Sequence, residues 1–232
     1  MGAGSAGFAA AFVLTLTLAA CSERPAGQPA SSTGEQASAA PVAGFTLSDD
    51  RKVATADLLL GDQLTDLPQE VAELRIREFR GEPDSLRSLR SLPNLRLLHL
   101  GGEISDAHLA EVAEIPGLRT LNLSRSAVTD KGLAELSRLT NLRLLRIASP
   151  AVTDDGMTAI AGLKSLRGLH LVDVPVSDRG IDILSRMTWL ESFYLDGSRA
   201  SDESLYRLIK ANPGLHFHRD QLHLPKDPNA DP

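Results

Sequence analysis

The chain has 232 residues, of which 42% are hydrophobic and 23% are charged, and its formal net charge is −6. This composition is typical of a globular protein, so a chain that is disordered throughout is excluded. The acidic balance also excludes a uniformly basic surface for phosphate contacts, and we therefore expect no nucleic acid partner.

The first part of the chain is an apolar stretch that ends at Cys21, the only cysteine. Residues 6–21 are too few for a helix that spans about 30 Å of hydrocarbon, which needs roughly 20 residues. The small residues in the run LAAC form a suitable cleavage point. The pattern predicts a signal peptide over residues 1–20.

The junction at Cys21 resembles the lipobox of bacterial lipoproteins. The resemblance implies that Cys21 becomes the acylated N-terminus of the mature chain, which leaves no cysteine for a disulfide. It also implies a place in the bacterial cell envelope, on the periplasmic or cell-surface side of a membrane. Ser22 resembles the residue that directs such proteins to the outer membrane.

Two segments separate the signal peptide from the remainder of the chain. Residues 21–44 are rich in Ala, Ser, Pro and Gly and offer little that could pack, which predicts a disordered tether. A flexible coil of this length has a root-mean-square span of roughly 25–30 Å. Residues 45–70 contain several leucines, and we expect them to form a helical N-terminal cap.

Residues 71–217 repeat one pattern every 23 or 24 residues. Each unit opens with the spacing L-x-x-L-x-L, which predicts a short strand with inward-pointing leucines. A hydroxyl residue and an Asp follow, and they suit the N-cap and first turn of a helix with apolar residues at helical spacing. One unit cannot bury its apolar face alone, so the units must stack. The hydroxyl–acid pairs are Ser105-Asp106, Thr129-Asp130, Thr153-Asp154, Ser177-Asp178 and Ser201-Asp202.

This pattern resembles the leucine-rich repeat family, specifically its 24-residue bacterial form with a T-D-x-G-L turn. The resemblance implies an α/β fold, a curved solenoid of about six repeats with parallel strands on the concave face and helices on the convex face. Phe217 and His218 lie one period after Phe193 and Tyr194 and predict a degenerate last strand, and residues 218–232 are expected to form a C-terminal cap and tail.

Two features of the repeat require contacts that the pattern does not identify. A glycine recurs in the first helical turn, and it predicts a close approach between neighbouring helices; the positions are Gly132, Gly156 and Gly180. The loop asparagines usual in the family are absent, so other groups must satisfy the loop carbonyls. These places hold Glu103 or Ile104, Ser126, Pro150, Val174 and Ser198.

One column of side chains is expected to point outward from the concave face, because alternate residues of a strand face opposite ways. These residues are large and hydrogen-bonding, and Tyr and Arg are typical of interaction hot spots. Partner binding and a merely solvated sheet face both fit the pattern. The column is Arg75, His99, Asn122, Arg146, His170 and Tyr194, with His218 next in line.

A second column consists of arginines that follow the first leucine of four repeats. Two positive charges about 5 Å apart repel by roughly 0.8 kcal/mol even in water, so these side chains must splay or find countercharge. They form either a solvated rim or a basic ledge for an acidic partner or an anionic glycan. The four residues are Arg96, Arg119, Arg143 and Arg167.

Motifs of known catalytic or metal chemistry are not found. The sequence contains no H-E-x-x-H, no G-x-S-x-G and no phosphate loop, so we expect neither an enzyme nor a cofactor. His216 and His218 would share one face of a strand and His223 follows, but no cysteine or firm carboxylate accompanies them, and no metal site is predicted.

Together these features predict a monomeric, lipid-anchored protein–protein interaction module. A glycan- or peptidoglycan-binding lipoprotein that uses the arginine column is the alternative. A hydrolase is a more remote one, and its only candidate cluster is Tyr194 with His170 and His218.

Overall fold

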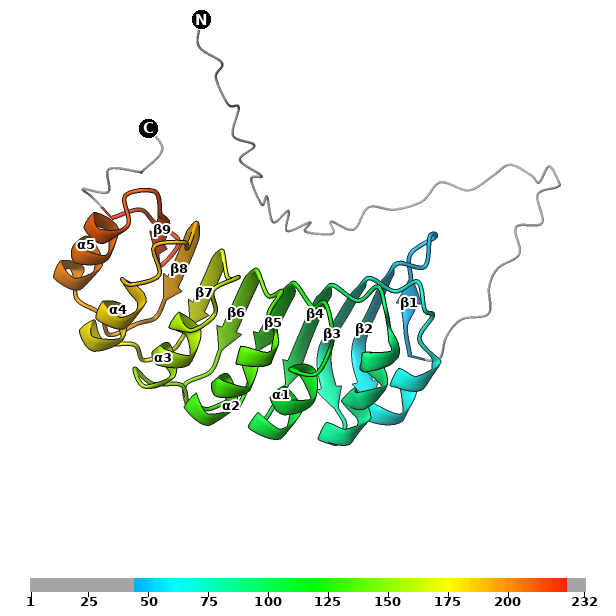
Figure 1. Ribbon diagram of the computed structural model, residues 1–232. Coiled ribbons are helices and arrows are strands. Elements are labelled where there is room, and N and C mark those ends of the chain that lie inside the picture. Colours follow the sequence, from blue (N-terminus) through cyan, green and yellow to red (C-terminus); the bar gives the residue numbers. More distant parts are fainter. Residues whose placement is uncertain (1–43, 225–232) are drawn as a thin grey trace, which may run out of the picture. The chain divides into compact units, whose positions relative to one another are not determined.

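The computed structural model describes residues 44–224. Within them, nine strands form one open sheet in chain order, and only the first pair, β1 and β2, is antiparallel (Figure 1). The strands are β1 (Thr46–Leu47), β2 (Val53–Leu60), β3 (Glu73–Arg80), β4 (Leu97–Gly102), β5 (Thr120–Ser124), β6 (Leu144–Ala148), β7 (Gly168–Val172), β8 (Ser192–Asp196) and β9 (His216–Arg219).

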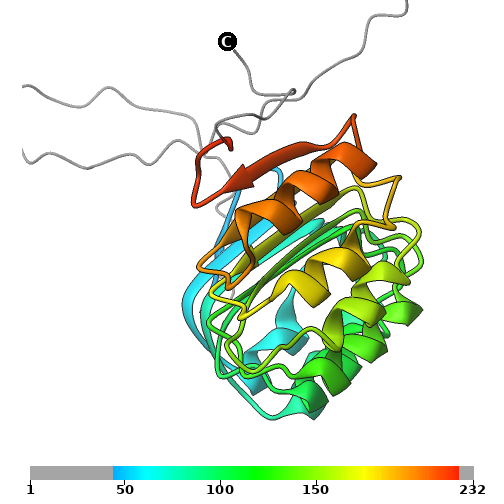
Figure 2. The same cartoon turned by 90° about the vertical axis from the view of Figure 1, so that its left-hand side faces the viewer.

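Short helices connect the parallel strands and cover one face of the sheet, so that the other face stays open (Figures 1 and 2). The folded unit is a shallow arc with the sheet on its inner side (Figure 1). The α-helices are α1 (Asp106–Val112), α2 (Asp130–Glu135), α3 (Gly156–Ala161), α4 (Asp178–Leu184) and α5 (Asp202–Ala211), and the 3₁₀ helices are η1 (Gly61–Asp66), η2 (Pro83–Ser91) and η3 (Leu136–Arg138).

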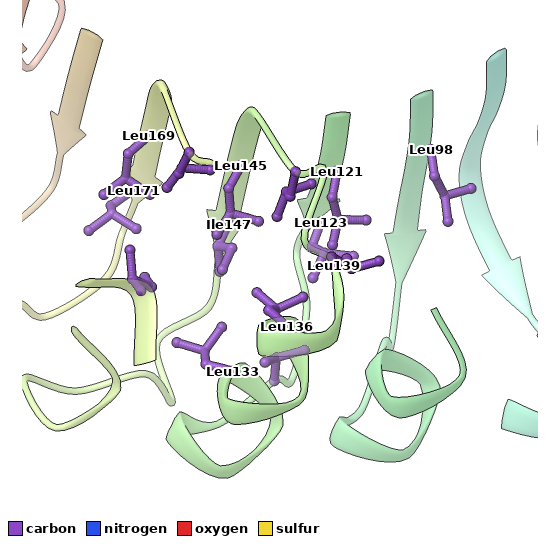
Figure 3. Packing of buried hydrophobic residues seen from close by; sticks show 14 of the residues in the cluster. Leu98, Leu121, Leu123, Leu133, Leu136, Leu139, Leu145, Ile147, Leu169 and Leu171 are labelled. Atoms are coloured by element: carbon purple, nitrogen blue, oxygen red, sulfur yellow. The ribbon is translucent and has the colours of Figure 1, made fainter. Parts of the chain in front are cut away.

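The strand leucines form a continuous interior between the sheet and the helices (Figure 3). Leu121, Leu145 and Leu169 are direct partners on adjacent strands and are at most 2% exposed. Leu133 and Leu136 approach from the helix layer (Figure 3). Full burial of a leucine side chain contributes roughly 1.5–3 kcal/mol. The prediction of stacked strand–loop–helix units is confirmed, and the chain is α/β with a solenoid-like order.

The helical cap predicted over residues 45–70 is wrong. Residues 53–60 form strand β2, which pairs in parallel with β3, and the helical part is limited to η1. The physical reason is that β3 would otherwise be an edge strand with unpaired backbone groups. Strand β2 supplies hydrogen bonds to these groups, which a helix cannot do. Ala54, Ala56 and Leu59 point into the core, whereas Leu58 and Leu60 are half exposed.

The helix starts follow the predicted hydroxyl–acid pairs with one exception. Ser105, Thr129, Ser177 and Ser201 are the N-cap residues of α1, α2, α4 and α5. Helix α3 instead begins at Gly156, because the backbone N–H of Gly156 donates to the carbonyl of Thr153 at 3.2 Å and tightens the first turn.

The acidic member of each pair joins its repeat to the next one. Asp130 accepts from the backbone N–H of Thr153 at 2.7 Å and from its hydroxyl at 2.6 Å. The same pair of bonds recurs between three other repeats and forms a ladder of carboxylates, which we call the aspartate ladder. Its other steps are Asp106 to Thr129, Asp154 to Ser177 and Asp178 to Ser201.

The recurring glycines make room for this ladder. A Cβ at Gly156 would lie 2.4 Å from Oδ1 of Asp130, and Gly132 and Gly180 face the preceding Asp in the same way. The close approach predicted from the sequence is therefore between a glycine and a carboxylate. The loop carbonyls are satisfied in part by hydroxyls, since Ser126 donates to the carbonyl of Ala148 and Ser149 donates to that of Val128.

Several predicted features fall outside residues 44–224. These features are the signal peptide over residues 1–20, the acylated Cys21, all but the last residue of the tether and the end of the tail. The degenerate last strand is confirmed as β9, so the boundary predicted at residue 218 falls inside a strand. No helix among residues 44–224 has both the length and the apolar composition to cross a bilayer.

Candidate functional site: the open sheet face

The predicted outward column lies in register on consecutive strands. Arg75 pairs with His99, His99 with Asn122, and the same order continues to Tyr194 and His218. Arg75 is exposed and forms an ion pair with Glu73 at 2.6 Å, and the other column residues are half-buried. The sheet therefore brings all the column residues predicted from the sequence onto one face.

Polar contacts join the middle of this column across four strands. Nη1 of Arg146 donates to Oδ1 of Asn122 at 3.4 Å, and its Nε donates to Nδ1 of His170 at 3.3 Å. Nε2 of His170 lies 2.9 Å from Oδ2 of Asp196. We call these four residues, Asn122, Arg146, His170 and Asp196, the polar chain.

The donors fix the tautomer of His170. A guanidinium only donates, so Nδ1 of His170 must accept and Nε2 must carry the proton that it donates to Asp196. The role of Asp196 was not predicted from the sequence, because its partner His170 lies 26 residues away in the chain. Its other oxygen, Oδ1, is buried and has no hydrogen-bond partner among the described residues.

His99 lies on the same face, and its surroundings favour the neutral form of its imidazole. Its Nε2 lies 3.0 Å from the hydroxyl of Ser124. Burial lowers the pKa of His99 below its usual range, and the positive charges of Arg146 and Arg75 lower it further. The imidazole therefore serves as a neutral hydrogen-bonding group rather than as a cation.

The end of the column near the C-terminus is aromatic. The ring of Tyr194 lies 5.5 Å from the ring of His170 and stacks on His218 at 4.9 Å, with 13° between the planes. The face thus changes from charged at β3 to aromatic at β8 and β9. A tyrosine held between two imidazoles offers a partner a rigid, amphipathic contact.

The four residues of the arginine column differ in their contacts. Nη1 of Arg96 donates to the carbonyls of Pro93 and Leu95, both at 3.0 Å. Arg167 donates to two carbonyls of its own loop in the same way. Arg119 and Arg143 are exposed and have no side-chain partner in the described part of the chain. Two of the four charges thus brace loops, which relieves the repulsion expected for the row.

Two hollows lie among the helix-to-strand loops. They have volumes of about 300 and 240 Å³, and the first is lined by residues around Pro116 and Arg138 and the second by residues around Trp189 and Pro213. Neither includes a residue of the outward column.

Comparisons with known proteins add no assignment. No protein-family model matches this chain, and a search of curated proteins found no similar sequence.

Proposed function

We propose that this chain is a lipid-anchored leucine-rich repeat protein of the bacterial cell envelope whose open sheet face binds a protein partner. The observation that carries the proposal is the polar chain from Asn122 to Asp196, which holds four functional side chains in one arrangement on an accessible face. Nothing in that arrangement resembles an activated nucleophile, so binding rather than catalysis is proposed.

The polar chain supports binding through pre-organisation. Immobilising a rotamer-rich side chain on association costs about 0.5–1.5 kcal/mol, and Arg146 is already held from two sides. Oδ2 of Asp196 likewise holds His170 at the other end of the polar chain. Tyr194 adds apolar contact area beside it, as hot-spot residues do.

A glycan ligand is less well supported. That alternative rests on the arginine column, of which Arg96 and Arg167 are occupied by carbonyls of their own loops. Binding through Arg119 and Arg143 alone would weaken steeply with salt, since both are exposed.

Site-specific photocrosslinking in intact cells tests the proposal. A photoreactive amino acid at Asn122 on the open face is expected to capture one protein partner, whereas the same group at the exposed Lys131 of α2 is expected to capture none. Capture from position 131 alone, or the same products from both positions, would contradict docking through the sheet face. In the same cells, a Cys21→Ser chain is expected to leave the membrane fraction, and its retention there would contradict the lipid anchor.

A further inference from the structure

Three imidazoles meet at β9, the last strand of the sheet. Figure 2 shows this strand at the edge of the sheet, beside α5. His216 and His218 lie two residues apart on β9. The chain then folds back through Asp220 and Gln221, whose φ values are 49° and 65°, and a bridge between Arg219 and Leu222 closes the turn. This turn places the ring of His223 4.1 Å from that of His218 and 5.3 Å from that of His216.

We propose that His216, His218 and His223 form a binding site for a divalent transition-metal ion of the Zn²⁺ class. Each residue offers one nitrogen, and these three nitrogens lie within 4.8 Å of one another. In a tetrahedral zinc site with bonds of 2.0–2.1 Å, neighbouring ligand nitrogens are about 3.3 Å apart. The three rings therefore need only small rotations to surround one ion.

The metal-free geometry shows what the ion would replace. Nε2 of His216 and Nε2 of His218 lie 2.7 Å apart, which is the distance of a hydrogen bond in which one ring donates its proton to the other. Coordination through both Nε2 atoms requires the donating ring to carry its proton on Nδ1 instead, and it moves the two nitrogens apart by about 0.6 Å, to the spacing of tetrahedral ligands. The hydrogen bond between the two rings is thus replaced by two bonds to one cation, and both imidazoles stay neutral.

The surroundings of the cluster restrict its rings. Tyr194 stacks on His218 and lies 6.1 Å from His216, so its ring limits the rotation of both. All three histidines are half-buried, which removes part of their hydration and still leaves access for an ion. With three protein ligands, the fourth tetrahedral position remains for water or for a donor atom of a bound partner.

The donor set selects the class of metal. Neutral imidazoles suit Zn²⁺, Ni²⁺ and Cu²⁺, whereas Mg²⁺ and Ca²⁺ require oxygen ligands. The sequence did not predict this site because His223 reaches the other two only through the left-handed turn at Asp220 and Gln221. The proposal is independent of partner docking, since it needs only these three side chains.

Titration of the purified full chain with Zn²⁺ tests the site. The chain carries no histidine tag and has a Cys21→Ser substitution, so that neither a tag nor the single thiol binds the ion. We expect one equivalent to bind with a Kd in the micromolar range or below, and a higher thermal midpoint in the presence of the ion. Replacement by Co²⁺ should give the visible absorption of a four-coordinate site.

Single variants decide whether the three histidines are the ligands. His223→Ala, His216→Gln and His218→Gln are each expected to weaken binding at least about tenfold, and His99→Gln on distant β4 is expected to leave it unchanged. Circular dichroism of each variant checks that it is folded, and His223→Ala, outside the strand, is the least disruptive of them. The proposal is overturned if no stoichiometric binding occurs, or if the folded His223→Ala and His216→Gln chains bind as tightly as the parent.

Discussion

Asp130 and Gly156 form a matched pair in neighbouring repeats. The carboxylate of Asp130 accepts two hydrogen bonds from Thr153, and hydrogen bonds to charged groups contribute about 1.5–3 kcal/mol each. The missing side chain of Gly156 leaves the space that the carboxylate needs. The glycine is therefore present for packing, although glycine inside a helix normally costs up to about 1 kcal/mol relative to alanine.

This pairing predicts a specific coupling between two substitutions. Gly156→Ala is expected to lower the free energy of unfolding by about 1–3 kcal/mol, because its Cβ would lie 2.4 Å from Oδ1 of Asp130. In an Asp130→Ala background only Cδ1 of Leu133, 3.0 Å from the added Cβ, remains close, and the same substitution should cost clearly less. Urea unfolding followed by the fluorescence of Trp189, the only tryptophan, measures all four members of the cycle.

Gly214→Ala is the matched control for that cycle, since no atom lies within 4 Å of an added Cβ there. Its effect is expected to be small in both backgrounds. Simple additivity of Asp130→Ala and Gly156→Ala would contradict the account of the glycine.

At the scale of elements, the aspartate ladder ends differently on its two sides. Asp202 in α5 has no following repeat, and Arg219 of β9 donates to it instead. At the first repeat, the backbone N–H of Ser105 donates to Nδ1 of His108 at 3.1 Å instead of to an aspartate. His108 occupies the glycine position, and its Nε2 lies 2.9 Å from the carbonyl oxygen of Gly81. His108 therefore ends the ladder at the first repeat and Arg219 ends it at the last one, and neither residue type occurs at the other steps.

These elements show which features were predictable from sequence. The spacing of leucines at 23 or 24 residues predicted the strands and the outward column, because strand alternation determines which side chains point out. The ladder was not predictable, since its bonds join residues 23 apart whose distance depends on helix packing. Residues 53–60 were predicted to be part of a helix, because a run of leucines fits the period of a helix as well as that of a strand. Pairing with β3 makes them a strand.

His99 on β4, with Arg75 on β3 and Arg146 on β6, is expected to make the stability of the fold depend on pH. The pKa of His99 is lowered by burial and by Arg146 and Arg75 on nearby strands. The unfolded chain, with a histidine pKa of about 6.5, therefore takes up this proton before the folded chain does as the pH falls. Stability from this group is full above that pH and decreases as the pH falls from there toward the folded-state pKa.

His99→Gln removes this contribution. Urea midpoints of both chains at pH 7.5 and 5.5 measure it, and the variant is expected to lose less stability on acidification than the wild-type chain. An equal loss in both chains would show that His99 has no lowered pKa.

At the scale of the folded unit, the width of the open face limits the size of the protein partner that we propose. Seven strands, β3 to β9, give a sheet roughly 29 Å wide at about 4.8 Å per strand. A standard protein interface buries about 800 Å² on each side, which such a face can supply. The surface therefore suits one domain or loop rather than a long polymer.

The affinity of the partner captured from position 122 tests the central claim most directly. Arg146→Glu breaks the middle of the polar chain and Tyr194→Ala removes its aromatic neighbour, while Lys131→Glu makes a comparable change on the helix side. We predict that each of the first two variants, shown to be folded by its thermal midpoint, binds at least about tenfold more weakly, a loss of about 1.4 kcal/mol, and that Lys131→Glu binds normally. Unchanged affinity of both Arg146→Glu and Tyr194→Ala would contradict docking through the sheet face.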